Sequence, residues 1–374
     1  MKNKTLAFLL LLAIIPSLSF AQLSSGTIAH NGLTRSYTLY LPANYTGNAS
    51  VPLILNFHGF GGDGLQQHVN SGFRPVADTA GFILVSPTGT PLAPLGINHW
   101  NVGGWTNGSN VDDISFTSAL IDSLIATYNI DSSRVYATGF SNGGFFSHRL
   151  ACELGGRIAA VASVSGTFTP TMASSCSPSR PISVLQIHGT TDGVVPYNGT
   201  TGNGGMTSVD SVINHWRNYN NCGPTPAVNA VPDLDTTDGS TVERITYSGG
   251  DGATVVELLK ISSGGHDWPG TAGNMDIIAA EEIWQFFARY NNYPVRVHSI
   301  SERNFKLYPN PTQDILQINL PDNGNYAYQL FSITGKKIES GFFNIKNTSL
   351  NTSNLLQGIY ILNINGETYK LIKE

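Results

Sequence analysis

Residues 134–152 read RVYATGFSNGGFFSHRLAC. The first residues form a short run with apolar side chains, as in a strand buried on both faces, whereas FFSHRLAC is typical of a helix. Between them, GFSNG (139–143) fits the pattern G-x-S-x-G, in which small residues let the chain turn sharply and expose the hydroxyl of Ser141. About 0.4 matches to this pattern are expected by chance in a chain of this composition, so the flanking elements carry the prediction of a strand–turn–helix unit.

Short apolar runs on both sides of this unit alternate with helical patterns. Strands are expected at 51–57, 82–86, 134–139, 158–166, 182–189 and 255–262. Apolar residues recur at helical spacing from Ile114 to Tyr128, behind Asp112 and Asp113, which suit the cap and first turn of a helix. A last helix is expected over 275–290. This repetition of strand and helix predicts an α/β domain whose mostly parallel sheet carries helices on both faces.

The residues before and after this alternation of strands and helices follow other sequence patterns. Residues 27–42 alternate around Asn31-Gly32, which is a hairpin signature. From about residue 304, short strands separated by Asn, Gly and Pro predict a small all-β sandwich domain. We therefore expect the α/β domain at 22–292, a linker at 293–303 and the β domain at 304–374.

The N-terminus is typical of a signal peptide at residues 1–21. Lys2 and Lys4 precede an apolar run from Leu6 to Ile15, and a small-residue cleavage site ends at Ala21. The run is about half of the ~20 residues that a membrane span requires. We therefore expect export to the periplasm, removal of the segment, and a mature chain without a membrane span.

Composition narrows the class of protein. Charged residues make up 12% of the chain, against ~25% in typical soluble domains, and there are 40 Gly. This is typical of an extracellular protein. The net charge is -5, and no cluster of Lys or Arg is present that would follow a phosphate backbone, so nucleic acid is not an expected partner. The nine His include no H-E-x-x-H, and we expect no metal and no cofactor.

Export permits disulfides, and the chain contains three cysteines, Cys152, Cys176 and Cys222. Their separations fit neither a paired C-x-x-C zinc site nor a haem attachment site. We expect a bond between Cys152 and Cys176, which enclose the shorter loop, and a free Cys222.

A serine hydroxyl is a poor nucleophile until a base accepts its proton, and that base needs a carboxylate on its other nitrogen. In α/β-hydrolases the order along the chain is Ser, then Asp or Glu, then His. Asp192 follows the strand at 182–189, and His266 follows the strand at 255–262. Both lie at the carboxyl ends of strands, where open α/β sheets place their ligand sites. The sequence therefore predicts an α/β-hydrolase fold with Ser141, Asp192 and His266 as its catalytic triad.

Other aspartates compete with Asp192 for the role of the acid, namely Asp63, Asp112, Asp113, Asp251 and Asp267. Position argues against them. Asp112 and Asp113 suit helix capping, and Asp251 lies on the turn before the last strand. Asp267 is too close in sequence to reach the far side of His266.

The oxyanion of an acyl-transfer intermediate needs preorganised N–H donors, each worth about 3 kcal/mol. We expect these from the backbone of Asn142, directly after the nucleophile, and of Phe60, in the HGFGG loop. His58 in the same loop is expected to be structural. Three indoles lie in loops and are predicted to line an apolar substrate groove, with core packing as the alternative. They are Trp100, Trp105 and Trp268.

With these residues assembled, residues 35–290 resemble the polyhydroxybutyrate depolymerase and feruloyl esterase group, close to the carbohydrate esterases that include acetylxylan esterases. The resemblance rests on HGFGGD (58–63), NVDDISF (110–116), GFSNGG (139–144), RPISVLQIHGTTDGVVPYNG (180–199) and GGHDWPG (264–270). It implies the same triad and oxyanion roles in a serine carboxylic-ester hydrolase. Many relatives pair a Cys near Cys222 with another in the turn at 247–252, which has none here, and this leaves the state of Cys222 open.

The last 70 or so residues resemble the C-terminal sorting domain of the type IX secretion system. The matching elements are YPNP (308–311), GK (335–336) and GIY (358–360). The resemblance implies the secretion machinery as a partner and a secreted or cell-surface location. A carbohydrate-binding module is the alternative for this domain.

The expected substrate is a polymeric ester, either a polyester such as polyhydroxybutyrate or an aromatic polyester, or a feruloyl or acetyl ester of a polysaccharide. No long apolar insertion that would serve as a lid follows Gly144 or Asp192, which predicts an open groove. Two other functions stay open. A prolyl-oligopeptidase-type serine peptidase would use the same triad but lacks its β-rich N-terminal domain here, and a surface adhesin would keep the fold without catalysis.

Overall fold

The computed structural model describes residues 21–202, 204–292, 305–332, 336–365 and 367–374. They form two compact units that divide near residue 294. The predicted signal segment, except for its last residue, and the predicted linker lie outside the described residues.

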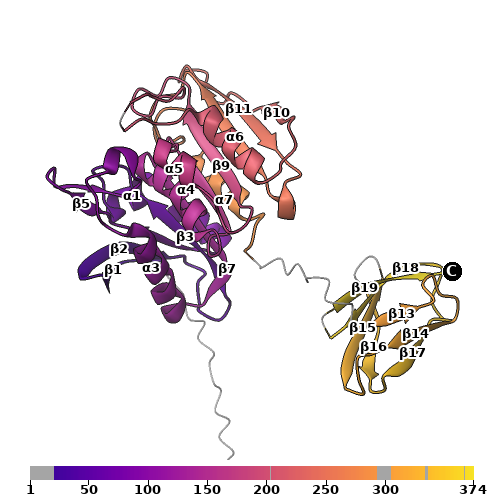
Figure 1. The fold of residues 1–374 in the computed structure, drawn as a ribbon. Coiled ribbons are helices and arrows are strands. Elements are labelled where there is room, and N and C mark those ends of the chain that lie inside the picture. Colours follow the sequence, from indigo (N-terminus) through magenta and orange to yellow (C-terminus); the bar gives the residue numbers. More distant parts are fainter. Residues whose placement is uncertain (1–20, 203, 293–304, 333–335, 366) are drawn as a thin grey trace, which may run out of the picture. The chain divides into compact units, whose positions relative to one another are not determined.

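The first unit is built on one ten-stranded sheet (Figure 1). In spatial order the strands are β1 (Gln22–His30), β2 (Leu33–Leu41), β4 (Ile83–Pro87), β3 (Val51–Phe57), β7 (Ile130–Phe140), β8 (Ala160–Val164), β9 (Ser183–Gly189), β12 (Val256–Ser262), β11 (Thr241–Tyr247) and β10 (Ala227–Ala230). The six central strands, β4 to β12, pair in parallel. The antiparallel pairs lie at the two edges, and β1 and β2 form the predicted hairpin. A small separate hairpin joins β5 (Thr90–Leu92) and β6 (Ile97–His99).

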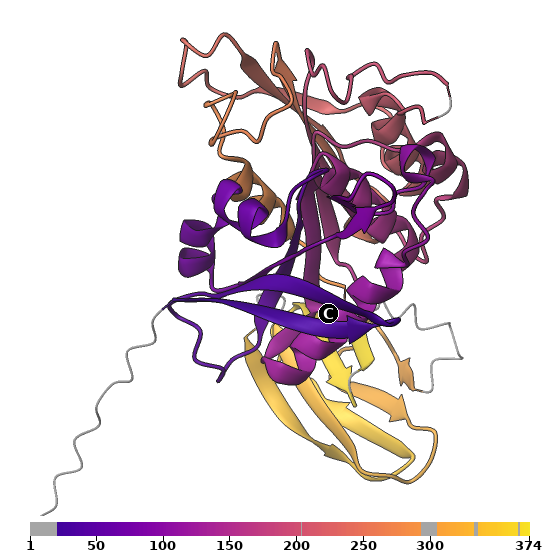
Figure 2. The same ribbon diagram turned by 90° about the vertical axis from the view of Figure 1, so that its left-hand side faces the viewer.

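Helices cover both faces of this sheet (Figures 1 and 2), which confirms the predicted α/β-hydrolase architecture. They are α1 (Gly64–Asn70), α2 (Phe73–Ala80), α3 (Asp113–Thr127), α4 (Asn142–Leu154), α5 (Pro170–Ser175), α6 (Val209–Tyr219) and α7 (Ala279–Phe287). Alternate residues of β3 point to opposite faces, so Leu53 packs in one buried cluster with α3, α4 and α6. Ile54 packs in the other with α2 and α7.

Some expected elements differ from those in the structure. The last helix begins at Ala279 and not near 275, because Asn274 and Asp276 form a hydrogen-bonded turn first. The edge strand β10, its neighbour β11 and the helix α6 were not predicted. At β11 the reason is visible, because this strand is half-exposed and lacks a continuous apolar run.

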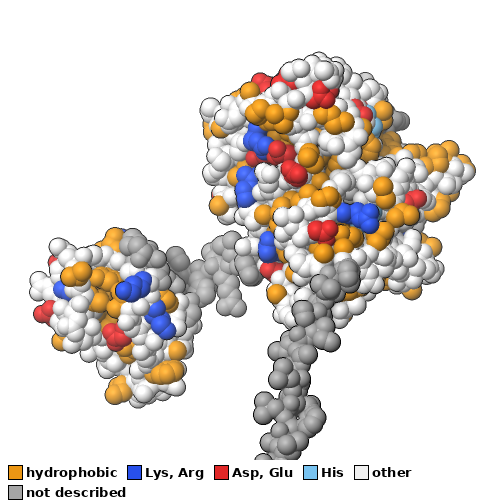
Figure 3. All heavy atoms as spheres, turned by 180° about the vertical axis from the view of Figure 1, so that it is seen from behind, with side chains coloured by type: hydrophobic (Ala, Val, Ile, Leu, Met, Phe, Trp, Pro, Cys, Tyr) orange, Lys and Arg blue, Asp and Glu red, His pale blue; other side chains and the backbone are white. Residues whose placement is uncertain are grey.

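Figure 3 views this unit from behind and shows few charged side chains, some of them in small groups of opposite charge, among uncharged atoms. This distribution follows from the low charged fraction of the chain, 12%.

The second unit consists of two antiparallel sheets. One sheet pairs β13 (Lys306–Tyr308), β14 (Ile315–Asn319) and β17 (Asn347–Asn351); the other contains β16 (Lys337–Phe343), β15 (Tyr326–Ser332), β18 (Gly358–Ile364) and β19 (Glu367–Lys373). Residues of both sheets share one buried cluster, which confirms the small all-β domain. Asn310 of the YPNP segment binds the backbone of the last strand, donating to the Lys370 carbonyl and accepting from the Ile372 N–H. Gly335 of the GK element lies outside the described residues.

The structure joins Cys152 and Cys176 in a disulfide, and Cys222 is a buried free thiol. The bond connects α4 to the residue after α5, with 24 residues of sequence separation. Replacing both bonded cysteines by Ala is expected to lower the free energy of unfolding by about 3 kcal/mol, since the bond restricts the unfolded chain. Urea unfolding with and without reductant measures this. A reductant should destabilise the wild type and the Cys222→Ala control alike, and an unchanged midpoint in the wild type would contradict the prediction.

Candidate active site

Ser141 lies on a strained turn between β7 and α4. Its backbone has φ 52° and ψ −117°, a conformation that L residues rarely adopt and that often marks functional sites. A Cβ on Gly143 would overlap the carbonyl oxygen of Phe57, and one on Gly139 would overlap Gly143. The two glycines of the motif are therefore required by the close packing of the turn on β3, and the turn is held as the sequence predicts.

Asp192 and His266 meet at the carboxyl ends of two neighbouring parallel strands, β9 and β12. Nδ1 of His266 lies 2.7 Å from Oδ2 of Asp192. Oδ1 of Asp192 accepts from the backbone N–H groups of Val194 (2.8 Å) and Val195 (2.7 Å). Because an ionised carboxylate only accepts, Nδ1 of His266 donates, and its Nε2 is left to take up a proton.

The surroundings of Asp192 keep it ionised. Burial raises the pKa of this carboxyl, but the hydrogen bonds from His266 and from the two backbone N–H groups outweigh burial, and the pKa lies below its ordinary value. Phe140, the residue before Ser141, packs against the ring of His266 with ring centroids 4.8 Å apart. The acid–base pair is thereby placed beside the nucleophile turn.

The loop after β3 runs past the nucleophile. A Cβ built on Gly59 would lie 3.4 Å from Cβ of Ser141. Within the described residues, the backbone N–H groups of Phe60 and Asn142 donate no hydrogen bond. Two unengaged donors next to Ser141 are what an oxyanion hole requires.

His58 is structural, as expected. Its Nδ1 donates to the Gly59 carbonyl (2.7 Å), and its Nε2 accepts from the Gly89 N–H (2.9 Å). Burial lowers the pKa of His58 to about 4. Both nitrogens are used by the neutral ring, so this side chain fixes the loop and is not available as a base.

Trp100 does not line a substrate groove, and the prediction for this residue is wrong. Its side chain is fully buried and stacks on Phe146. The indole N–H donates to the His58 carbonyl (3.1 Å), while the backbone of Trp100 forms a pair of hydrogen bonds with the side-chain amide of Asn142 (2.7 and 3.1 Å). Trp100 therefore connects the loop after β3 to the residue after the nucleophile. Its loop position concealed this role, because the sequence does not show which loops pack inward.

The other two indoles lie near the surface of the site. Trp268 is mostly buried, donates to the Ser71 carbonyl (3.0 Å) and lines a cavity beside His266. Trp105 is half-buried and meets the exposed ring of Phe60 edge-on, with centroids 5.7 Å apart. A substrate contact for Trp105 and Trp268 stays a prediction.

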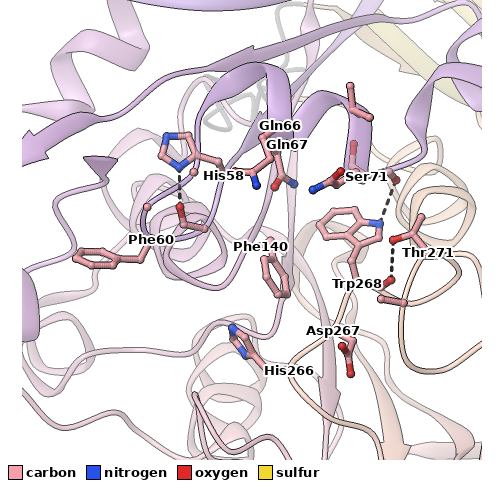
Figure 4. A pocket seen from close by; sticks show the side chains of 16 residues that line it. His58, Phe60, Gln66, Gln67, Ser71, Phe140, His266, Asp267, Trp268 and Thr271 are labelled. Atoms are coloured by element: carbon pink, nitrogen blue, oxygen red, sulfur yellow. Dashed lines mark hydrogen bonds between the residues drawn. The ribbon is translucent and has the colours of Figure 1, made fainter. Parts of the chain in front are cut away.

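The cavity has a volume of about 710 Å³ (Figure 4). It is bounded by the loop after β3 and by α1 on one side, and by Phe140 and residues 266–272 on the other. His266 lines this cavity, whereas Ser141 and Asp192 are not among its lining residues.

Buried polar residues behind the site were missed in the sequence. Asp112 caps α3 as expected, but Asp113 is fully buried, pairs with Arg35 (2.8 Å) and accepts from the Asn101 N–H (2.9 Å). Asp113 thus lies in the first turn of α3, as predicted, but its carboxylate holds the loop that follows Trp100 and does not cap the helix. Acidic pairs at helix starts give no sequence signal that separates the capping residue from the buried one.

Two buried histidines make the fold sensitive to acid. Nε2 of His148 bonds Oε1 of Gln186 (2.9 Å), and Nδ1 accepts from the Trp216 indole (3.3 Å). Burial lowers the pKa of His148 to about 4, as it does for His58. Both take up protons in the unfolded chain near pH 6.5 but in the folded chain only near 4, so stability is complete above pH 6.5 and declines as the pH falls toward 4.

At pH 5 the expected loss is about 2 kcal/mol for each of these histidines relative to pH 7. The variant His148→Gln keeps a donor and an acceptor but does not titrate. Urea unfolding at pH 7 and pH 5 should give a smaller loss for this variant than for the wild type. Equal losses would show that His148 is not a buried neutral base.

Comparisons with known proteins agree with this geometry. Residues 46–203 match the Phospholipase/Carboxylesterase family model, and residues 306–374 match the Secretion system C-terminal sorting domain. A bifunctional acetylxylan esterase/xylanase of Neocallimastix patriciarum is 29% identical over 69% of this chain and 34% of its own length. Feruloyl esterase B of Piromyces equi is 30% identical over 62% of this chain and 42% of its own length. The chain thus spans a third to two fifths of these two relatives.

Feruloyl esterase D of Neurospora crassa is 29% identical, and the match covers 77% of this chain and 97% of that protein. Among solved structures, an acetyl xylan esterase from Aspergillus awamori has a TM-score of 0.51 at 16% identity, covering 71% of this chain and 99% of that one, a likeness of fold. The first unit has the α/β-hydrolase fold and contains the match to the Phospholipase/Carboxylesterase model, with similarity to feruloyl and acetylxylan esterases, and the second unit matches the secretion sorting domain.

The sorting domain indicates a secreted or cell-surface protein. In the part of the chain that the structure describes, no helix is long and apolar enough to cross a membrane.

Proposed function

We propose that the protein is a secreted serine carboxylesterase in which Ser141, Asp192 and His266 form the catalytic triad. The observation that carries the proposal is the hydrogen bond between Asp192 and His266 beside a serine on a strained strand-to-helix turn. In this arrangement the carboxylate fixes the tautomer of the histidine, and the histidine activates the serine. The match to a carboxylesterase family model supports it.

The reaction follows from these positions. His266 Nε2 accepts the hydroxyl proton of Ser141 as Oγ attacks the ester carbonyl, and the backbone N–H groups of Phe60 and Asn142 hold the oxyanion. When the intermediate collapses, the bond to the alcohol breaks and His266 gives its proton to the leaving oxygen. Water then attacks the acyl-serine with His266 as base, releasing the acid. Two successive products leave, so ping-pong kinetics are expected.

The substrate class we propose is a feruloyl or acetyl ester of a plant polysaccharide. The curated relatives are named as feruloyl esterases and an acetylxylan esterase/xylanase, and secretion delivers the enzyme to insoluble polymers. The cavity beside His266 is open and has the exposed side chains of Phe60 and Val69 at its rim, which suits a bulky neutral ester.

A panel of esters tests both levels of the proposal. Hydrolysis of 4-nitrophenyl acetate and butyrate is expected, together with methyl ferulate or acetylated xylan. If the protein releases acid from polyhydroxybutyrate or an aromatic polyester but cleaves neither methyl ferulate nor acetylated xylan, its substrate class is a polyester and not a polysaccharide ester. Preference for long-chain triglyceride would contradict the open site. Cleavage of a prolyl peptide without ester hydrolysis would indicate a peptidase, and inactivity on all of them would favour an adhesin.

We also propose that the chain is divided into a catalytic domain at 22–292, a linker at 293–303 and a sorting domain at 304–374. All proposed catalytic residues precede Tyr290, so a truncated chain of residues 22–292 is expected to keep kcat/KM on 4-nitrophenyl acetate within about twofold. Surface delivery should be lost in the producing cell. A truncated chain with a native circular dichroism spectrum but tenfold lower kcat/KM would contradict this division.

A further inference from the structure

A second histidine lies beside the proposed catalytic acid. His188, near the end of β9, is 1% exposed, and its Nε2 lies 3.4 Å from Oδ2 of Asp192, the oxygen that faces His266. The same Nε2 lies 2.8 Å from the carbonyl oxygen of Val195. Whether this ring nitrogen carries a proton decides whether it attracts or repels the two oxygens.

The tautomer of His188 follows from its neighbour Gln186. One end of the Gln186 amide faces the Gly166 carbonyl at 2.9 Å, and because a carbonyl only accepts, this end is the NH2 group. The same NH2 group lies 3.1 Å from Nδ1 of His188. The amide oxygen accepts from Nε2 of His148 (2.9 Å), as this orientation requires. Nδ1 of His188 is therefore an acceptor. Burial lowers the pKa of His188, so the ring is neutral and its single proton is on Nε2.

This proton holds the turn that carries the acid. Nε2 of His188 donates it to the Val195 carbonyl (2.8 Å), while the Val195 N–H donates to Oδ1 of Asp192 (2.7 Å). Val195 is thus fixed at both its carbonyl and its amide, between the end of β9 and the carboxylate. Because Nε2 is protonated, no lone pair of the ring opposes Oδ2 of Asp192 at 3.4 Å.

We propose that His188 is a positioning residue for the catalytic acid, whose Nε2–H group holds the turn at 192–195 so that Asp192 keeps Oδ2 directed at His266. The inference rests on the proposed triad and adds a residue that does not touch the ester. Since the effect on catalysis passes through Asp192, loss of the Nε2–H group should slow the acid–base steps and lower kcat. Binding of the ester, and with it KM, should change little.

The variants His188→Asn and His188→Gln test the donor at the Nε2 position. The shorter Asn reaches only as far as Nδ1 of the histidine, whereas Gln can place an NH2 group where Nε2 was. On 4-nitrophenyl acetate, His188→Asn is expected to lower kcat about 10- to 100-fold with KM within about twofold, and His188→Gln to recover most of that loss. Leu124→Ala, on α3 in the same buried cluster as Val195, is the control for lost stability and should keep the wild-type kcat.

A double-mutant cycle with Asp192→Asn tests the route of the effect. If His188 acts through Asp192, adding His188→Asn to a chain that already carries Asp192→Asn should lower kcat less than about twofold. Single-turnover hydrolysis with enzyme in excess measures these low rates. A further 10-fold loss in that background would overturn the inference, because His188 would then act independently of the acid.

The outcomes separate this inference from the proposed function. A wild type that is inactive on the 4-nitrophenyl esters would refute the esterase proposal itself. In an active wild type, a folded His188→Asn with unchanged kcat, or a loss in His188→Gln equal to that in His188→Asn, would refute the positioning role alone. If His188→Asn does not fold, Gln186→Met takes its place, since it keeps the shape of Gln186 but removes the donor that imposes the Nε2–H tautomer. A lower kcat at unchanged KM then supports the inference, and an unchanged kcat refutes it.

Discussion

Ser141→Ala is expected to lower kcat for ester hydrolysis by about 10⁴- to 10⁶-fold, because the nucleophile and its base act as one unit and neither works alone. The substitution removes only the hydroxyl. The backbone of Ser141 keeps its hydrogen bonds to Val164 (2.8 Å) and from Phe145 (3.0 Å), so the turn should remain folded. The residual rate would come from the oxyanion donors and substrate binding.

The measurement is steady-state hydrolysis of 4-nitrophenyl acetate, with the thermal midpoint as a check on folding. Ser174→Ala, an exposed serine whose hydroxyl bonds only the Thr171 carbonyl, is the matched control and should keep wild-type turnover. If Ser141→Ala retains a tenth of the wild-type kcat while the control behaves normally, Ser141 is not the nucleophile.

Asp192→Asn is expected to lower kcat by about 10⁴-fold. The reason lies in the fixed environment of this side chain. Two backbone N–H groups, from Val194 and Val195, point at one oxygen and require an acceptor there. The amide NH2 of Asn must then face His266, which can only accept at Nδ1 and so carries its proton on Nε2. A histidine in that tautomer cannot take the proton of Ser141.

The pH dependence of kcat and the unfolding free energy should be measured for this variant. Folding is expected to be nearly unchanged, since the two backbone hydrogen bonds persist. If the variant has native stability and loses less than tenfold in kcat, the catalytic acid is another residue. If the variant does not fold, Asp192→Ala should be measured with added formate as the replacement carboxylate. Recovery of activity with formate supports the role of Asp192, and no recovery contradicts it.

Elements with a strong local signal were predicted closely. β3 coincides with the expected strand at 51–57, because a strand buried on both faces must be continuously apolar. The turn around Ser141 was predicted for a related reason, since glycine is the only residue that fits where the turn meets Phe57. The strand β11, next to the edge strand β10, was missed, because a half-exposed strand needs neither a continuous apolar run nor a glycine.

By itself, the sequence determined the six central strands of the sheet, the positions of the serine, acid and histidine at the ends of strands, and the small β domain that follows. These properties depend on local features of the sequence, namely hydrophobic periodicity, the positions of glycines and the order of the motifs along the chain. Only the tertiary structure decided that Trp100 is buried and holds the loop after β3, and that Asp113 pairs with Arg35. Each depends on which loops pack inward, and that is set by contacts between residues far apart in the chain.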